Sequence, residues 1–197
     1  MKLEHITNKW IDRVNQLPFK HFSCHSELPT EYLDALLAWF ERDAPWKRVN
    51  ESFYDQYEFS LFDAKIPSKL SFLTERFFLD ELIQYVESLF STKLAKQVDV
   101  VAHKLISGDL IKIHNDFIEG QETHRILFHI NRSWTEEFGG YFMIFYADDP
   151  ECIHDVIPPK HGSVHGFEIS ENSHHAVSKV HGGERFTLIY SFYKQLS

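Results

Sequence analysis

Cysteine is scarce in this chain: only Cys24 and Cys152 occur among its 197 residues, far apart in sequence. Because small disulfide-built domains need several cysteines, this scarcity argues against a disulfide framework and favours reduced thiols. An apolar signal core is also missing from the first residues, and no apolar run approaches the roughly 20 residues that span a membrane. We therefore expect a cytoplasmic protein that does not enter a membrane.

Clustered positive charge is lacking as well. The 20 lysines and arginines are outnumbered by 29 aspartates and glutamates, which gives a formal net charge of -9. Nucleic-acid binding needs clustered Lys and Arg against the phosphates, so no nucleic-acid partner is expected. The sequence shows no internal repeat and no low-complexity segment. A hydrophobic content of 43% over this length predicts a packed core and one domain, residues 1–197.

Helical periodicity dominates the first half of the chain. Apolar residues recur at helical spacing there, and prolines interrupt the pattern. The pattern predicts helices over 2–16, 33–40, 67–77 and 79–90, and a short strand over 19–23. Residues 52–62 are aromatic and acidic and are predicted to form an irregular strand. That strand either packs against the rest of the fold or forms a lid that faces the substrate.

After residue 96 the period changes from helical to extended. Short strands are predicted over 98–107, 110–114, 125–131, 141–147, 152–157, 162–168, 175–180 and 185–193. A hairpin-type turn is expected at Gly108-Asp109 and a second turn at Gly182-Gly183. Helices followed by many short strands predict an α+β fold, with the helices on one side of an antiparallel sandwich or barrel. Residues 1–96 would then form a helix-rich support for a β core over 97–197.

A histidine and a carboxylate two residues apart are the first indication of a metal site. In an extended segment, residues i and i+2 project to the same face, so His114 and Asp116 converge. A histidine from a distant strand, such as His175, would complete the two-histidine, one-carboxylate facial triad of non-haem Fe(II) oxygenases. His174 competes with His175, because neighbouring residues of a strand point to opposite faces and only one can serve. Arg185 lies shortly downstream, and its planar charged fork suits a carboxylate ligand such as 2-oxoglutarate.

These residues form part of a longer ordered set. The set comprises His114-x-Asp116, Arg125 to Asn131, Trp134, Gly139-Gly140, His175-Ala-Val177 and Arg185-x-Thr187. It resembles the Fe(II)/2-oxoglutarate-dependent oxygenases, specifically their prolyl 4-hydroxylase-like branch, over about the C-terminal half of the chain. The resemblance implies a double-stranded β-helix, or jelly roll, with the N-terminal helices packed on one face.

The resemblance also implies a set of cofactors and the residues that hold them. His114, Asp116 and His175 would bind Fe(II), with His175 selected by the family's His-x-Val pattern. Arg185 would bind the far carboxylate of 2-oxoglutarate, and Thr187 would add a hydrogen bond. Dioxygen is the other cosubstrate, and ascorbate is an accessory cofactor that the resemblance allows. The expected reaction hydroxylates an unactivated C–H bond and releases succinate and CO2; a carboxylate at position 116 favours this over halogenation.

Several other positions in the resembling region have roles that the sequence leaves open. Lys104 and His129 stand where some relatives have tyrosines that contact 2-oxoglutarate, so both are predicted to bind the cosubstrate. The alternative for each is a residue of the barrel wall with a local partner. Arg125 either reaches toward the substrate or has a structural role. Asn131 and Trp134 are expected to serve structure.

The substrate is expected to be a small polar metabolite, an amino acid or a natural-product intermediate, in preference to a protein. The chain is acidic and rich in aromatic residues, and no peptide-binding extension is recognisable. The alternative is a hydroxylase of prolyl or other residues in proteins. Two further alternatives are a non-catalytic module that binds metal or 2-oxoglutarate, and a cupin-type dioxygenase that uses no cosubstrate. Desaturation or cyclisation would use the same iron site.

Overall fold

The computed structural model describes residues 14–26, 28–51 and 54–195. Its helices are α1 (Thr30–Arg42) and α2 (Arg76–Phe90), with the 3-10 helices η1 (Leu61–Asp63), η2 (Ser68–Thr74) and η3 (Glu136–Phe138). Its strands are β1 (His21–His25), β2 (Lys47–Asn50), β3 (Asp55–Ser60), β4 (Leu94–Ile106), β5 (Ile111–His114), β6 (His124–His129), β7 (Phe142–Phe145), β8 (Ile153–Ile157), β9 (Ser163–Glu168), β10 (His175–Val177) and β11 (Glu184–Lys194). The helix predicted over 2–16 lies outside the described residues except for 14–16, which are not helical.

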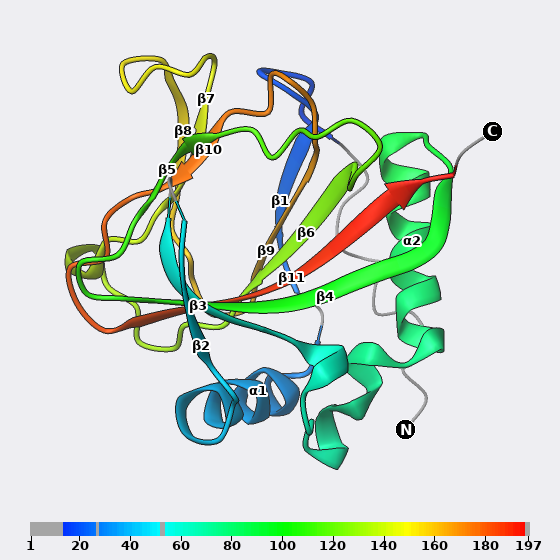
Figure 1. Cartoon of the computed structure of the whole chain (residues 1–197), viewed down its shortest axis with the longest axis vertical. Coiled ribbons are helices and arrows are strands. Elements are labelled where there is room, and N and C mark those ends of the chain that lie inside the picture. The colour runs from blue at the N-terminus through cyan, green and yellow to red at the C-terminus, as the bar shows by residue number, and fades with distance from the viewer. Residues whose placement is uncertain (1–13, 27, 52–53, 196–197) are drawn as a thin grey trace.

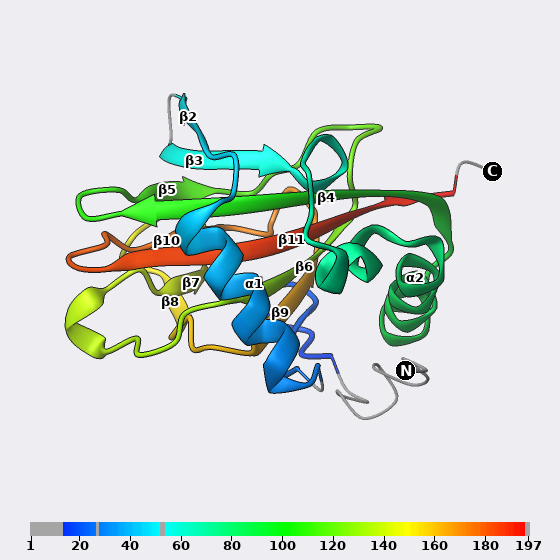
Figure 2. The same cartoon turned by 90° about the horizontal axis from the view of Figure 1, so that it is seen from below.

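Two sheets form the body of the protein. In the described part of the chain the larger sheet has seven strands in the order β1-β9-β6-β11-β4-β3-β2, and the smaller has four in the order β5-β10-β7-β8. The strand pairs are antiparallel, as at β11 with β4 and β10 with β5. The smaller sheet lies across one face of the larger, and α1 and α2 lie on the other side (Figure 1; Figure 2). The predicted α+β class and double-stranded β-helix are confirmed.

Strand β11 shows how the sequence builds this layering. Phe186, Leu188 and Tyr190 are buried among the apolar residues of α1, α2 and η2. Ile189 points the other way and belongs to the apolar cluster between the two sheets. Successive side chains of a strand project to opposite faces, so a single strand can serve both cores. The central strands therefore separate a helix-side core from the space between the sheets.

The helices bury one face each, as their apolar periodicity predicts. In α1 the buried stripe is Leu33, Leu36, Leu37, Trp39 and Phe40. In α2 it is Phe78, Leu79, Leu82, Ile83, Tyr85, Val86 and Phe90. Both stripes join the helix-side core against the larger sheet. Since this side of the sheet is closed by helices, access to the inter-sheet space comes from elsewhere.

Two details of the predicted strand order are wrong. Gly108-Asp109 does not close a hairpin, because β4 before it belongs to the larger sheet and β5 after it to the smaller. Turn residues predict that the chain changes direction, but not which strand it pairs with next. Strand β2 also escapes sequence-based prediction, because its side chains are polar and mostly exposed and lack apolar alternation. The helix-rich front part thus also supplies β1, β2 and β3 to the larger sheet.

Cys24 and Cys152 are free thiols. None of the helices in the described ranges has both the length and the apolar character needed to cross a membrane.

Candidate metal and cosubstrate site

Three potential metal ligands meet where β5 and β10 pair. His114 ends β5, His175 begins β10, and the two residues lie directly opposite each other in the sheet. Their imidazole centroids are 4.2 Å apart. The chain then turns back at Asp116, whose φ of 59° lies in the left-handed region that aspartate tolerates better than most residues. The donor atoms of the three side chains all lie within 4.8 Å of one another.

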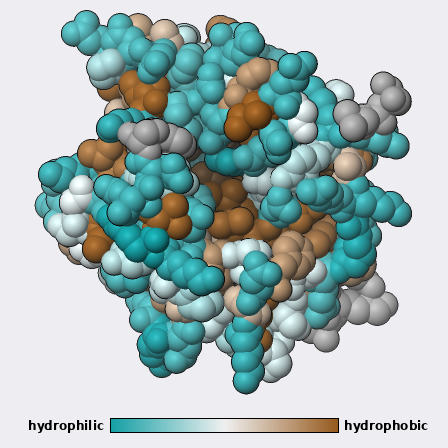
Figure 3. All heavy atoms as spheres, in the orientation of Figure 1, coloured by the Kyte–Doolittle hydropathy of each residue, from teal (hydrophilic) through white to brown (hydrophobic). Residues whose placement is uncertain are grey.

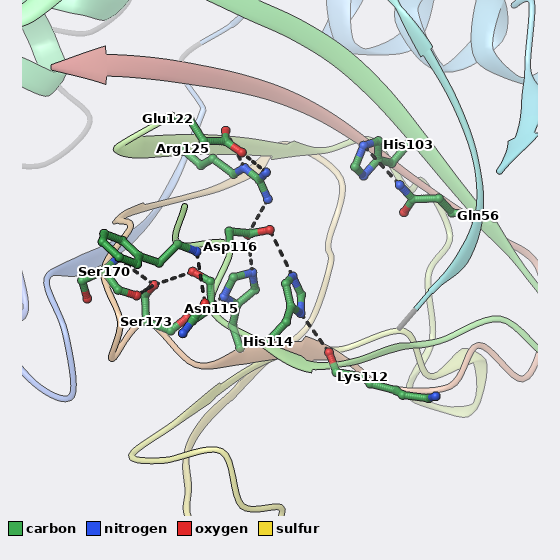
Figure 4. Close-up of polar contacts among 12 residues, drawn as sticks. Gln56, His103, Lys112, His114, Asn115, Asp116, Glu122, Arg125, Ser170 and Ser173 are labelled. Atoms are coloured by element: carbon green, nitrogen blue, oxygen red, sulfur yellow. Dashed lines mark hydrogen bonds and ion pairs between the residues drawn. The ribbon is translucent and has the colours of Figure 1, made fainter. Parts of the chain in front are cut away.

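Backbone carbonyls set the orientation of both imidazoles. His114 Nδ1 lies 2.8 Å from the Lys112 carbonyl, and His175 Nδ1 lies 2.7 Å from the Ser173 carbonyl. Because a carbonyl oxygen only accepts, each Nδ1–H must donate and each Nε2 is left to face Asp116. Figure 4 shows this arrangement for His114. The Nε2 atoms of His114 and His175 are 3.5 Å and 3.1 Å from the Asp116 carboxylate. Burial, and then the charge of His114, lower the pKa of His175, which favours the neutral form that binds metals.

Asp116 is held from the other side by Arg125. An Arg125 Nη1–H donates to Asp116 Oδ2 at 2.5 Å, and the same guanidinium donates to both carboxylate oxygens of Glu122. Burial alone would raise the pKa of Asp116. The charge of Arg125, with smaller contributions from the two histidines, outweighs that effect and holds the pKa well below its usual value. The carboxylate is therefore ionised, as a metal ligand must be.

A serine joins the two loops that carry these ligands. Ser173 is fully buried, and its hydroxyl lies 2.8 Å from the Asn115 carbonyl and 2.7 Å from the Ser170 carbonyl. The Asn115 side chain in turn donates to the Glu171 carbonyl at 3.0 Å. The turn before His175 is thereby tied to the residue before Asp116 (Figure 4).

The guanidinium of Arg185 is buried and has no anionic partner among the described residues. It is 5% exposed; its Nε–H donates to the Gly140 carbonyl at 2.7 Å, and Nη1 donates to Thr187 Oγ1 at 2.8 Å. Among the described residues no hydrogen-bond partner is found for its Nη2, and no carboxylate lies within ion-pair distance. Burial lowers the pKa of Arg185 to about 9, so the guanidinium stays charged at neutral pH. Gly140 is required beside it, because a Cβ there would lie 2.9 Å from Arg185 Cδ.

One cavity of about 690 Å³ is lined by the three potential metal ligands together with Arg125 and Arg185. It lies between the two sheets, and the face seen in Figure 3 is hollowed near its middle, with apolar residues at the bottom and polar ones around the opening. Its polar lining includes His114, Asp116, His175, Arg185, Thr187 and Arg125. Its apolar lining includes Val101, Ile111, Leu127, Phe142, Val177 and Ile189. A space of this size is in the usual range for small-ligand sites.

The structure does not bring every predicted site residue to this cavity. Lys104 is on the opposite face of β4, where it donates to Glu184 at 3.2 Å and lies over the rings of Trp46 and Tyr57. His129 does not line the cavity. It is fully buried, with Nδ1 3.4 Å from Thr187 Oγ1, and so touches the site only through that hydroxyl.

His174 and Arg125, whose roles the sequence leaves open, both line the cavity. His174 is not among the clustered donor atoms, whereas His175 is. Arg125 has its side chain engaged by Asp116 and Glu122. Asn131 and Trp134 bind backbone carbonyls: Asn131 those of Pro159 and Phe186, and Trp134 that of Gly139.

Sequence-based prediction assigns no site role to several polar cavity residues, among them Gln56 and Glu58 of β3 and His103 of β4. The prediction for 52–62 offered packing or a substrate-facing strand, and β3 does both. Phe59 packs in the helix-side core, while Gln56 and Glu58 face the cavity. The i, i+2 spacing of Gln56 and Glu58 indicates that both side chains are on one face of β3. The sequence does not indicate that this face lines the cavity.

The residues of this cavity fit Fe(II) and 2-oxoglutarate. Two neutral imidazole nitrogens and one carboxylate oxygen are the donor set that non-haem Fe(II) sites use, with positions left open. The buried, unpaired edge of Arg185 fits the far carboxylate of a dicarboxylic acid. Bound Fe(II) would supply the activation of dioxygen, coupled to decarboxylation of 2-oxoglutarate.

Comparisons with known proteins agree with this geometry. Residues 100–192 match the family model of the 2OG-Fe(II) oxygenase superfamily. A stretch of 104 residues is 28% identical to prolyl 3-hydroxylase OGFOD1 of Xenopus laevis. That stretch covers 51% of this chain but only 20% of the relative, so the chain spans about a fifth of that protein's length.

Solved structures share the fold over most of the chain. A prolyl-4-hydroxylase of Pseudomonas putida has a TM-score of 0.74 at 18% identity, covering 89% of this chain and 93% of the other. A prolyl hydroxylase of Trichoplax adhaerens, in complex with a hypoxia inducible factor peptide fragment, has a TM-score of 0.70 at 12% identity, covering 88% and 83%. Residues 100–192 therefore match the 2OG-Fe(II) oxygenase superfamily, whose members use Fe(II), 2-oxoglutarate and dioxygen, and the chain has the jelly-roll fold of these solved structures.

Proposed function

We propose that this chain hydroxylates prolyl residues in a protein or peptide substrate. The observation that carries the proposal is the 28% identity to a prolyl 3-hydroxylase over 104 residues. The similarity of the fold to prolyl hydroxylase structures, one of them holding a peptide, supports it. The two unpaired cysteines favour the cytoplasm as its setting.

The expectation that a small molecule is the substrate in preference to a protein is wrong. The relative and the similar structures are prolyl hydroxylases, and the Trichoplax structure contains a peptide. The absence of a recognisable peptide-binding extension is weak ground for excluding proteins, because a peptide can bind at an open cavity built into the barrel. Next to Asp116, Phe117 and Ile118 line the cavity and are 42% and 65% exposed, so its edge offers apolar surface to a peptide.

Each part of the proposed site has a separate task. His114, Asp116 and His175 would hold Fe(II), with their ring orientations set by backbone carbonyls. Arg185 and Thr187 would hold the far carboxylate of 2-oxoglutarate at the larger sheet. The apolar cavity wall excludes water from the space between them. A substrate proline would then enter from the open side of the cavity.

Mass spectrometry of protein substrates tests the proposal. The enzyme with Fe(II), 2-oxoglutarate and ascorbate would be incubated with a protein extract, with an Asp116→Ala variant as the inactive control. We expect an added oxygen on specific prolines that depends on 2-oxoglutarate, and amino-acid analysis then identifies the ring carbon. Oxidation confined to residues other than proline, or no oxidised protein, would overturn the proposal.

A further inference from the structure

Beyond the iron and cosubstrate residues, the wall of the cavity formed by β3 and β4 is unusually rich in hydrogen-bond acceptors. Gln56 and Glu58 of β3 and His103 of β4 line it, and none of them has a task in the proposed chemistry. Gln56 is 2% exposed. Its Nε2–H donates to Glu58 Oε2 at 2.8 Å, and the same nitrogen lies 3.4 Å from His103 Nε2. Figure 4 shows the amide of Gln56 turned toward His103.

The partner of the Gln56 amide nitrogen fixes which way the amide points. A carboxylate accepts hydrogen bonds only, so the amide NH2 must face Glu58 and the carbonyl oxygen must point elsewhere. That oxygen, Gln56 Oε1, is buried and has no hydrogen-bond partner among the described residues. A buried acceptor without a donor is costly. The cavity therefore presents an acceptor that a bound donor would satisfy.

Glu58 beside it forms no ion pair with a lysine or arginine among the described residues. Its side chain is 31% exposed, His103 lies 3.8 Å from it, and Lys47 stands opposite it on β2 without an ion pair. Burial lowers the pKa of His103 to about 3, so this imidazole is neutral at physiological pH. Asp148, which lines the same cavity, has no cationic partner within the described residues either. By contrast, Asp116 and Glu122 are both paired with Arg125.

The charge and the acceptors together define a ligand chemistry. An ammonium or guanidinium group can donate to Glu58 and Gln56 Oε1 at once and would satisfy both. A dicarboxylate such as 2-oxoglutarate would be repelled by Glu58, whereas Arg185, on β11 of the same sheet, attracts it. We infer that Gln56 and Glu58 form a substrate subsite for a lysine or arginine side chain close to the target proline, with Asp148 adding to the negative field. The inference rests on the proposed prolyl hydroxylation.

A peptide series tests this subsite. The peptides have one central proline, alanine at the flanking positions, and a single lysine moved through those positions in turn, with norleucine or glutamate in its place as controls. Hydroxylation by the enzyme with Fe(II) and 2-oxoglutarate would be followed by mass spectrometry. Binding of labelled peptides under anaerobic conditions would be followed by fluorescence anisotropy. At one flanking position we expect lysine to exceed norleucine by about ten-fold or more in both readouts.

Variants connect that preference to the subsite. Glu58→Gln should remove the advantage of lysine while leaving norleucine peptides within about two-fold of wild type, because the charge alone is removed. Glu58→Lys should favour the glutamate peptide. Glu151→Gln is the matched control, since Glu151 is exposed and does not line the cavity. Thermal unfolding of each variant checks that the fold is intact.

The outcomes separate the subsite from the proposed function. Hydroxylation that is indifferent to the flanking charge, or a lysine preference that persists in folded Glu58→Gln, would overturn the subsite and leave prolyl hydroxylation standing. If wild-type enzyme consumes 2-oxoglutarate but oxidises none of the peptides, prolyl hydroxylation itself is overturned, and the subsite with it.

Discussion

Arg185 is buried in a position that the fold alone does not explain. A guanidinium at 5% exposure, with one edge unpaired, is costly unless a ligand completes it. The surroundings hold it ready: Gly140 and Thr187 bind two of its nitrogens. The third is turned toward no acceptor among the described residues, which is the arrangement expected for a cation that binds an anionic cosubstrate.

The first prediction is that Arg185→Met weakens 2-oxoglutarate binding strongly but changes the stability of the protein little. Losing a buried charge-assisted contact should weaken 2-oxoglutarate binding by about 2–5 kcal/mol, which is a roughly 30-fold or larger rise in Kd. The ligand-free variant should lose less than about 1 kcal/mol of unfolding free energy, because a desolvated charge is removed with its hydrogen bonds. Titration with Fe(II) and 2-oxoglutarate measures the first effect, and urea unfolding measures the second. A purely structural Arg185 would give a large loss of stability with unchanged 2-oxoglutarate affinity.

At this scale, sequence spacing predicts some side-chain positions and misses others. His114, Asp116 and His175 lie together, but a left-handed turn after β5, and not the extended strand that the spacing assumed, brings the Asp116 carboxylate in. Lys104 does not reach the cavity, whereas its neighbour His103 does. A shift of one residue moves a side chain to the other face of a strand, so a resemblance that aligns β4 one place off selects the wrong residue. The hydrogen bond between Arg125 and Asp116 also depends on how a loop folds, which no local pattern encodes.

Among the elements, the two loops that carry metal ligands depend on the Ser173 hydroxyl. The second prediction is that Ser173→Ala lowers the affinity for Fe(II) by about 10–100-fold, the usual effect of removing a contact behind the ligands. The hydroxyl links the turn before His175 to the Asn115 carbonyl, so its loss frees both loops. Metal titration under anaerobic conditions measures the effect. Ser170→Ala is the matched control, because the Ser170 side chain contacts only the Asn172 amide in its own turn. Equal affinities for the two variants would contradict the prediction.

A second inter-element contact joins β2 to the turn between β4 and β5. Arg48 donates to both oxygens of Asp109, each at 2.7 Å, and Asp109 is 7% exposed. Burial raises the pKa of Asp109. The hydrogen bonds from Arg48 and the Ile106 amide, and the charge of Arg48, lower it by more, so the pKa lies below its usual value. The contact therefore stabilises the fold above the pKa of the unfolded state, about 3.9, and is lost as the pH falls through the folded-state pKa.

The third prediction follows for Arg48→Met. We expect a loss of about 1–3 kcal/mol in unfolding free energy at pH 7, because the buried carboxylate is left without its partner. The difference from wild type should shrink at pH 3, which lies below the unfolded-state pKa, because protonation of Asp109 then favours the unfolded wild-type protein. Urea unfolding at both pH values measures it. Arg76→Met breaks the exposed pair with Asp80 and should cost no more than about 0.5 kcal/mol. A deficit in Arg48→Met that is independent of pH would show that the ion pair is not its cause.

Elements with strong periodicity are predictable, and elements without it are not. The stripes of α1 and α2 and the alternation of β11 each identify one buried face. Strand β2 carries no such pattern and is held by pairing with β3 and by the contact of Arg48 with Asp109. The turn at Gly108-Asp109 is visible in the sequence, but the partner of the following strand, β10, lies about 60 residues away. Pairing between strands so far apart cannot be predicted from a short stretch of sequence.

In the whole molecule, the residues that would bind Fe(II) and 2-oxoglutarate face the space between the two sheets. The metal-binding residues come from β5, β10 and the loop after β5 in the smaller sheet, whereas Arg185 and Thr187 come from β11 in the larger. Fe(II) with 2-oxoglutarate would therefore connect the sheets across the cavity. The sequence predicts the metal-binding residues and Arg185 with Thr187. That the two sheets face each other, and so bring these groups together, depends on the whole fold.

The fourth prediction is that metal and cosubstrate together stabilise the protein more than either does alone. Ligands at about 100 times their Kd contribute roughly 2.7 kcal/mol, and for a chain of this length each kcal/mol raises Tm by roughly 2–4 °C. Wild-type protein with Mn(II), which stands in for Fe(II) without turnover, and 2-oxoglutarate should thus gain about 5–10 °C in thermal unfolding. His175→Ala should lose the gain from both ligands, because 2-oxoglutarate would be held partly through the metal that His175 would bind. His174→Ala should keep it, since its donor atoms are outside the cluster. The opposite order of these two variants would make His174 the ligand, and equal gains from 2-oxoglutarate with and without metal would show that the two ligands do not bind as one unit.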